Sequence, residues 1–184
     1  QELGPRVWQL AHQAFQVGQS GTVEAFTAGF GGEYARTRID CRLVGRGAEG
    51  RLAAAYYGED DQTLDFRTFQ EHAAPDTTSD LLFKGALDGA SHSIYSGLIR
   101  VRPEAVRTRA HQTNRNVKLS PDAWAESVPN LEIETDDVVC SHASTVSPVD
   151  EDQRFFLESR GVPTRVAERL LLEGFFQDAA DAAP

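Results

Sequence analysis

The residues best suited to chemistry stand close together in the segment Asp136–His142, which reads DDVVCSH. If this segment is a strand, residues two apart point to the same face, so Cys140 and His142 project side by side. A thiolate and an imidazole are good ligands for iron or zinc. Two ligands from one strand leave at least two coordination positions to be filled from elsewhere. The other interpretation is a buried structural cysteine beside a hydrogen-bonded histidine.

The remaining histidines are weaker candidates for chemistry than this pair, and the familiar catalytic motifs are absent from the sequence. His72, His92 and His111 lie in polar or turn-like sequence, where a histidine held by ordinary hydrogen bonds is the favoured interpretation. The sequence contains no G-x-S-x-G elbow, no P-loop, no G-x-G-x-x-G after a strand and no H-E-x-x-H. The acidic pairs Asp60–Asp61 and Asp136–Asp137 are placed as turn residues between strands. No self-contained active site, and hence no enzyme, is predicted.

Composition excludes several classes of partner. Of the 184 residues, 40% are hydrophobic and 25% are charged, as in an ordinary globular domain. The net charge is −10, and the chain lacks the basic face with which proteins neutralise nucleic-acid phosphates. No stretch approaches the ~20 apolar residues that span a bilayer, so no membrane partner is expected. The two cysteines are too few for a disulfide framework, and we expect a reducing, cytoplasmic location.

The elements that must hold this pair are short extended segments, which recur from about residue 20 to residue 146. Typical segments are Arg36–Val44, Gly50–Tyr57, Thr63–Phe69 and Ser93–Val101. In the first, apolar and polar residues alternate with a period of two, which predicts a half-buried strand. Blocks such as Leu52–Tyr57 indicate strands that are covered on both faces. Strands spaced by ~12–15 residues, without long intervening helices, predict a mainly β architecture.

Sandwich, barrel and β-helix are all compatible with this spacing. Asp88–Gly89 is the one good Asp-Gly hairpin signal, and weak hairpin chemistry favours a solenoid, although no strict repeat proves it. The β core is expected over residues 1–149 and a helical segment over residues 150–184. In the latter, Asp150 and Gln153 can form a capping box, Gly161 is placed as a helix stop, and a second helix begins near Pro163.

The second predicted helix carries more apolar residues than one packing face needs. Its predicted packing stripe consists of Val166, Ala167, Leu170, Leu171 and Phe175. Two further apolar residues widen that stripe. A surface for a partner protein and deeper burial of the helix within this chain explain the excess equally well.

Seven short motifs follow one another in a fixed order along the chain. They are Thr77–Leu87 (TTSDLLFKGAL), Ser96–Val101 (SGLIRV), Gln112–Asn116 (QTNRN), Pro129–Ile133 (PNLEI), Asp136–His142 (DDVVCSH), Phe156–Gly161 (FLESRG) and Gly174–Phe175. This series resembles the C-terminal half of the SufB/SufD family of iron–sulfur cluster assembly scaffolds, from about Gly29 to Phe176. The flanks of His142 are Ser141 and Ala143, where the SufB branch usually has glutamates, so the resemblance is to the SufD branch. Leu157, which stands where SufB-like chains tend to carry a cysteine, points the same way.

The resemblance implies a right-handed parallel β-helix with a C-terminal two-helix segment, acting as a non-catalytic scaffold in the SUF system. A SufB-like subunit would pair through the β-helix. A SufC-like ABC ATPase would dock on the C-terminal helices, with Phe156, Arg160 and Gly161 as expected contacts. An iron–sulfur cluster would form transiently at the subunit interface with the help of His142 and Cys140, and this chain alone would bind no cofactor.

Three further expectations accompany this reading. The chain would be part of a longer protein, and a β-helix cut across its coils exposes a strand edge that favours a homodimer in isolation. Cys140 and His142 would face outward, toward the second protein. The alternatives are a SufB-like subunit that holds the cluster itself and, more remotely, a β-helix enzyme acting on polysaccharides.

Overall fold

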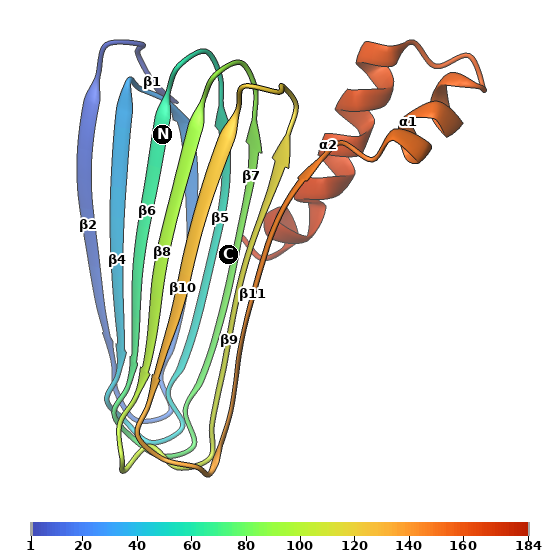
Figure 1. Cartoon of the computed structure of the whole chain (residues 1–184). Coiled ribbons are helices and arrows are strands. Elements are labelled where there is room, and N and C mark those ends of the chain that lie inside the picture. Colours follow the sequence, from blue (N-terminus) through green and yellow to red (C-terminus); the bar gives the residue numbers. More distant parts are fainter. Residues whose placement is uncertain (1, 184) are drawn as a thin grey trace.

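The chain folds into a parallel β-helix followed by two helices, in a computed structural model that describes residues 2–183 (Figure 1). One sheet, sheet A, runs in spatial order β1 (Glu2–Leu3), β3 (Thr22–Gly31), β5 (Glu49–Gly58), β7 (Thr78–Leu87), β9 (Thr108–Lys118) and β11 (Val138–Pro148). The other, sheet B, runs β10 (Trp124–Ile133), β8 (His92–Val101), β6 (Thr63–His72), β4 (Tyr34–Leu43) and β2 (Trp8–Val17). Neighbouring strands in both sheets are parallel. The predicted solenoid is therefore confirmed.

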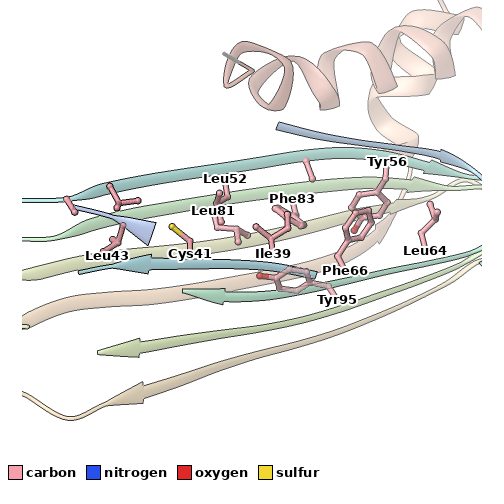
Figure 2. Packing of buried hydrophobic residues seen from close by; sticks show 13 residues of the cluster. Ile39, Cys41, Leu43, Leu52, Tyr56, Leu64, Phe66, Leu81, Phe83 and Tyr95 are labelled. Carbon is pink, nitrogen blue, oxygen red and sulfur yellow. The ribbon is translucent and has the colours of Figure 1, made fainter. Parts of the chain in front are cut away.

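Aromatic rings from the two sheets alternate along the axis and hold the sheets together (Figure 2). The ring centroids of Tyr56 and Phe66 lie 4.6 Å apart, those of Phe66 and Phe83 5.6 Å, and those of Phe83 and Tyr95 5.5 Å. All four side chains are buried, and offset or edge contacts of this kind add to the area that they bury. The period-two alternation places these rings inside because β-strand side chains alternate between the two faces.

Gly85 makes room for one of these rings. It lies in register with Tyr56, and a Cβ at Gly85 would run into the Tyr56 ring. The ring can therefore lean across β7, which brings the Tyr56 hydroxyl within 2.7 Å of the Asn116 side-chain oxygen.

On the outer face of sheet B, carboxylates are held between side chains of neighbouring coils. Asp65 is 0% exposed, and its Oδ2 lies 2.7 Å from Arg36 Nη2 and 2.9 Å from the Tyr34 hydroxyl, while its Oδ1 lies 2.7 Å from Arg67 Nε. Burial alone would raise the pKa of Asp65, but the hydrogen bonds from its three partners outweigh burial and hold the pKa below its ordinary value. Each such cluster ties together successive coils.

Two predictions about the β region need correction. Strands begin at β1 (Glu2–Leu3) and β2, and not near residue 20; β2 is an edge strand whose inward row includes Gln9 and Gln13, so apolar alternation is weak there. The Asp88–Gly89 pair does not form a hairpin. It connects β7 of sheet A to β8 of sheet B, and Gly89 adopts a φ of +62°, which suits glycine.

The two C-terminal helices are α1 (Glu151–Glu158) and α2 (Thr164–Asp181). Asp150 accepts a hydrogen bond of 3.0 Å from the backbone N–H of Gln153, so Asp150 caps the helix, which is one half of the predicted capping box. Gly161 has a φ of +84°, as expected of a residue that ends the first helix. No helix within residues 2–183 has the length and apolar character needed to cross a bilayer.

Helix α2 rests on sheet A beside β5 and β7 (Figure 1). Lys84 of β7 is nearly buried beneath it and donates to the carbonyl of Phe175 at 2.6 Å and to the Asp178 carboxylate. The same ammonium lies 4.7 Å from the centroid of the Phe175 ring. One lysine thus attaches the far end of α2 to the solenoid.

Candidate functional site

Cys140 and His142 lie on β11, the last strand of sheet A. Cys140 is in register with Ala110 of β9, and His142 is in register with Gln112. Ala110 and Gln112 are both buried inside the coil, so the two site residues share a face, as the sequence predicts.

The expectation that this shared face points outward is wrong. Parallel pairing preserves the facing of each residue, so Cys140 and His142 belong to the interior row of the final coil. They nonetheless reach solvent, since no strand of residues 2–183 pairs with the outer edges of β10 and β11. Cys140 is half-buried and His142 is exposed. The pair is therefore accessible from the open end of the solenoid.

The Cys140 thiol sits at the edge of a small apolar cluster. It packs with Leu131 and Val138 against buried residues that include Ile99 and Ala110. Burial raises the pKa of the Cys140 thiol above its ordinary value, and the hydrogen bond with the Ala110 backbone offsets only part of that rise. The resting group is therefore a neutral thiol at neutral pH, which must lose its proton to coordinate a metal.

Two polar residues that sequence reasoning did not assign to the site accompany this pair. Gln112 is 1% exposed and pairs in register with His142 from the neighbouring strand β9, and neither amide atom of its side chain has a hydrogen-bond partner among residues 2–183. The Ser127 hydroxyl on β10 is also buried without a partner. No local pattern assigns these two residues to the interior; they stand out only in the structure, because polar side chains inside a coil need partners. Within the described residues, no three His, Cys, Asp or Glu side chains are grouped as a metal site.

The other histidines are held elsewhere. His72 is fully buried, with Nδ1 2.8 Å from the Thr77 hydroxyl and Nε2 2.9 Å from the Ser79 hydroxyl, so its structural role is confirmed. His111 is exposed, and its Nδ1 lies 2.7 Å from Ser141 Oγ. It sits within strand β9 and not in a turn.

His92 starts β8, and its ring packs edge-on against Trp124, with centroids 5.6 Å apart.

The residues expected to contact an ATPase lie together at the end of α1. Phe156 is 54% exposed, and the guanidinium carbon of Arg160 lies 3.7 Å from the centroid of the Phe156 ring. Gly161 follows directly. Phe155 is still more exposed, at 70%.

The predicted packing stripe of the second helix is only partly buried. Val166 and Leu170 are each 46% exposed, whereas Ala167 and Ala179 are fully buried. Small residues thus provide the close contact, and larger apolar residues remain on the surface of the helix pair.

Comparison with known proteins identifies the family of this chain. The family model described as "SUF system FeS cluster assembly, SufBD core domain" matches residues 1–175. This chain belongs to the SufBD family. The match begins earlier than the resemblance from Gly29 suggested, and it includes the β2 and β3 strands.

Several relatives are identified by name as SufBD or SufD proteins. An iron–sulfur cluster assembly SufBD family protein of Mycobacterium leprae is 39% identical over 174 residues, which cover 90% of this chain and 44% of the relative. The iron–sulfur cluster assembly protein SufD of Escherichia coli is 28% identical over 97% of this chain and 42% of its own length. SufD of Bacillus subtilis is 32% identical over 77% of this chain and 32% of its own length. The chain thus spans less than half the length of these relatives.

Proposed function

We propose that this chain is the C-terminal part of a SufD-like, non-catalytic scaffold subunit on which an iron–sulfur cluster is assembled at an interface with a second subunit. Membership of the SufBD family supports a role in iron–sulfur cluster assembly. One observation supports the place: a thiol and an imidazole lie side by side at the open end of the solenoid, where a facing chain can reach them.

The chemistry of these two side chains suits the iron of a nascent cluster. Iron accepts both thiolate and imidazole ligands, and two of its coordination positions stay available for sulfide or a partner's side chains. Binding converts the Cys140 thiol to a thiolate and releases its proton. An imidazole coordinates through the lone pair of a ring nitrogen, so His142 is the better first ligand, and Cys140 follows once the iron is held.

A SufB-like subunit is the proposed partner at this end. Within the described part of the chain, strands β10 and β11 each have one neighbour, so their outer edges offer backbone N–H and C=O groups for pairing with another sheet. The same edges could pair with a second copy of this chain when no partner is present. Light scattering on the isolated chain should then give a dimer, and a monomer at high concentration would count against edge pairing.

The helix pair is the proposed docking site for a SufC-like ABC ATPase. Exposed aromatic and arginine side chains are typical of strongly contributing interface residues, and Phe156 and Arg160 form such a pair. Phe156→Ala should weaken co-purification of the ATPase while the solenoid stays folded. Unchanged co-purification would move the docking site elsewhere.

The decisive experiment substitutes His142 in the full-length protein. His142→Ala should stop cluster formation in cells that depend on this protein, with the same thermal unfolding as wild type, because the side chain is exposed. His111→Ala is the matched control, since His111 is an exposed histidine on the adjacent strand that faces away from the coil interior. Normal cluster formation by His142→Ala would defeat the assignment.

A SufB-like role, in which this chain holds the cluster itself, is the second candidate. The observation in its favour is that both soft ligands are accessible on one chain. Iron and sulfide added to the isolated full-length protein distinguish the two roles. A stable cluster chromophore would favour the SufB-like role, and its absence is expected of a SufD-like subunit.

A further inference from the structure

A buried carboxamide forms the floor beneath His142. Gln112 is the register partner of His142, and Gly97 is the register partner of Pro129 on the facing strand. A Cβ at Gly97 would lie 2.6 Å from Gln112 Nε2 and 2.7 Å from Gln112 Oε1. The amide therefore reaches across the lumen from β9 to β8. It occupies the layer directly below the one that His142 and Pro129 form.

The hydrogen-bonding capacity of this amide is unused. Both Gln112 Nε2 and Oε1 are buried and have no hydrogen-bond partner within residues 2–183, which is unfavourable for a polar group. Two other interior amides of β9 differ, because Asn116 Nδ2 donates to Asn114 Oδ1 at 3.0 Å and Asn116 Oδ1 lies 2.7 Å from the Tyr56 hydroxyl. A leucine would fill the space of Gln112 without this penalty. The unpaired amide of Gln112 thus lies directly beneath His142, which belongs to the last coil of the solenoid.

We propose that Gln112 is a positioning residue for His142, an inference that rests on the function proposed above. When the imidazole coordinates iron through one ring nitrogen, its other nitrogen carries a proton that needs an acceptor. Gln112 Oε1 accepts that N–H from below. The hydrogen bond fixes the tautomer and turns the free nitrogen lone pair toward the open end, where the iron is delivered.

The test measures metal binding with Co²⁺ as a spectroscopic probe, added to the complete protein purified with its associated subunits. Gln112→Leu should raise the Kd for Co²⁺ by roughly 10–100-fold, the usual effect of losing a residue that orients a metal-bound histidine. Gln112→Glu keeps an oxygen acceptor and should bind nearly as wild type. Gln70→Leu is the matched control, because Gln70 is equally buried, has no partner for its amide and lies on β6, two strands away from β10.

Thermal unfolding separates positioning from a merely structural role. Gln112→Leu and Gln70→Leu both remove a buried unpaired amide, so both should unfold at or above the wild-type temperature. Weaker binding in a protein that is no less stable supports the proposal. Equal Co²⁺ affinity of Gln112→Leu and wild type would overturn it. So would a similar loss in Gln70→Leu, or no recovery in Gln112→Glu.

One further variant keeps this inference distinct from the proposed function. His142→Ala should abolish the same Co²⁺ binding. If it does and Gln112→Leu binds normally, only the role of Gln112 fails. If Co²⁺ binding survives in His142→Ala, the metal-binding role of His142 fails, and the role of Gln112 fails with it.

Discussion

His72 makes the stability of the solenoid depend on pH. Its ring lies at the end of β6 between the hydroxyls of Thr77 and Ser79, and Thr77 Oγ1 is 3.0 Å from Thr108 Oγ1 of the next coil. Thr108 in turn donates to the Ala105 carbonyl at 2.8 Å. This chain of hydroxyls suits a neutral ring that donates through Nδ1 and accepts from Ser79 at Nε2. A second ring proton would sit on Nε2 and point at the Ser79 hydroxyl, which donates to that nitrogen when the ring is neutral.

The magnitude follows from the burial of the ring. Burial lowers the pKa of His72 from 6.5 to about 4. Between pH 6.5 and pH 4, His72 is therefore protonated in the unfolded chain but not in the folded chain. The free energy of unfolding consequently falls as the pH falls through this window. At pH 5 the loss relative to pH 7.5 is about 2 kcal/mol, and it approaches about 3 kcal/mol near pH 4.

Urea unfolding at a series of pH values measures this effect. Wild type should lose about 2 kcal/mol between pH 7.5 and pH 5, whereas His72→Gln should be less stable at pH 7.5 but nearly flat over the same interval. The difference between the two curves isolates His72 from carboxylates with lowered pKa values, which lose their stabilising contribution at lower pH. Parallel curves for the two proteins would refute the reasoning.

Three other substitutions test the packing of the coils. Asp65→Asn should cost about 2–3 kcal/mol in urea unfolding, because a buried carboxylate loses its charge between two arginines; an unchanged midpoint would show that the cluster contributes nothing. Gly85→Ala should cost about 1–3 kcal/mol because the new methyl displaces the Tyr56 ring, and a thermal midpoint equal to wild type would contradict this packing. Lys84→Met should speed hydrogen exchange in α2 alone, and equal exchange would mean that other contacts hold the helix.

Local patterns in the sequence predict most of the fold, and they fail where context decides. The alternation in Arg36–Val44 correctly places Ile39 and Cys41 inside, since one face of β4 is covered. The same rule misses β2. This strand lies at the edge of sheet B, and its inward row includes the amides of Gln9 and Gln13. The burial of His72 is not evident from the sequence, because its hydroxyl partners, Thr77 and Ser79, come to it from the start of the next strand, β7.

The site shows the same division between local and long-range information. The spacing of Cys140 and His142 is enough to place them on one face of a strand. Which face that is depends on register with β9, which is set some 30 residues earlier in the sequence, at Ala110 and Gln112. The lack of a partner for the Gln112 amide depends on the opposite strand as well, so no local pattern reveals it.

The open end of the solenoid has an energetic consequence for the site that it carries. In a stacked array, each coil gains stability chiefly from its immediate neighbours, and the final coil here has a neighbour on one side only. Local opening should therefore be easiest at β10 and β11, and amide exchange should slow progressively toward the middle of the stack. A protein that caps this end would quench the fluctuations of Cys140 and His142 as it docks, so a rigid ligand geometry would exist only in the company of that protein.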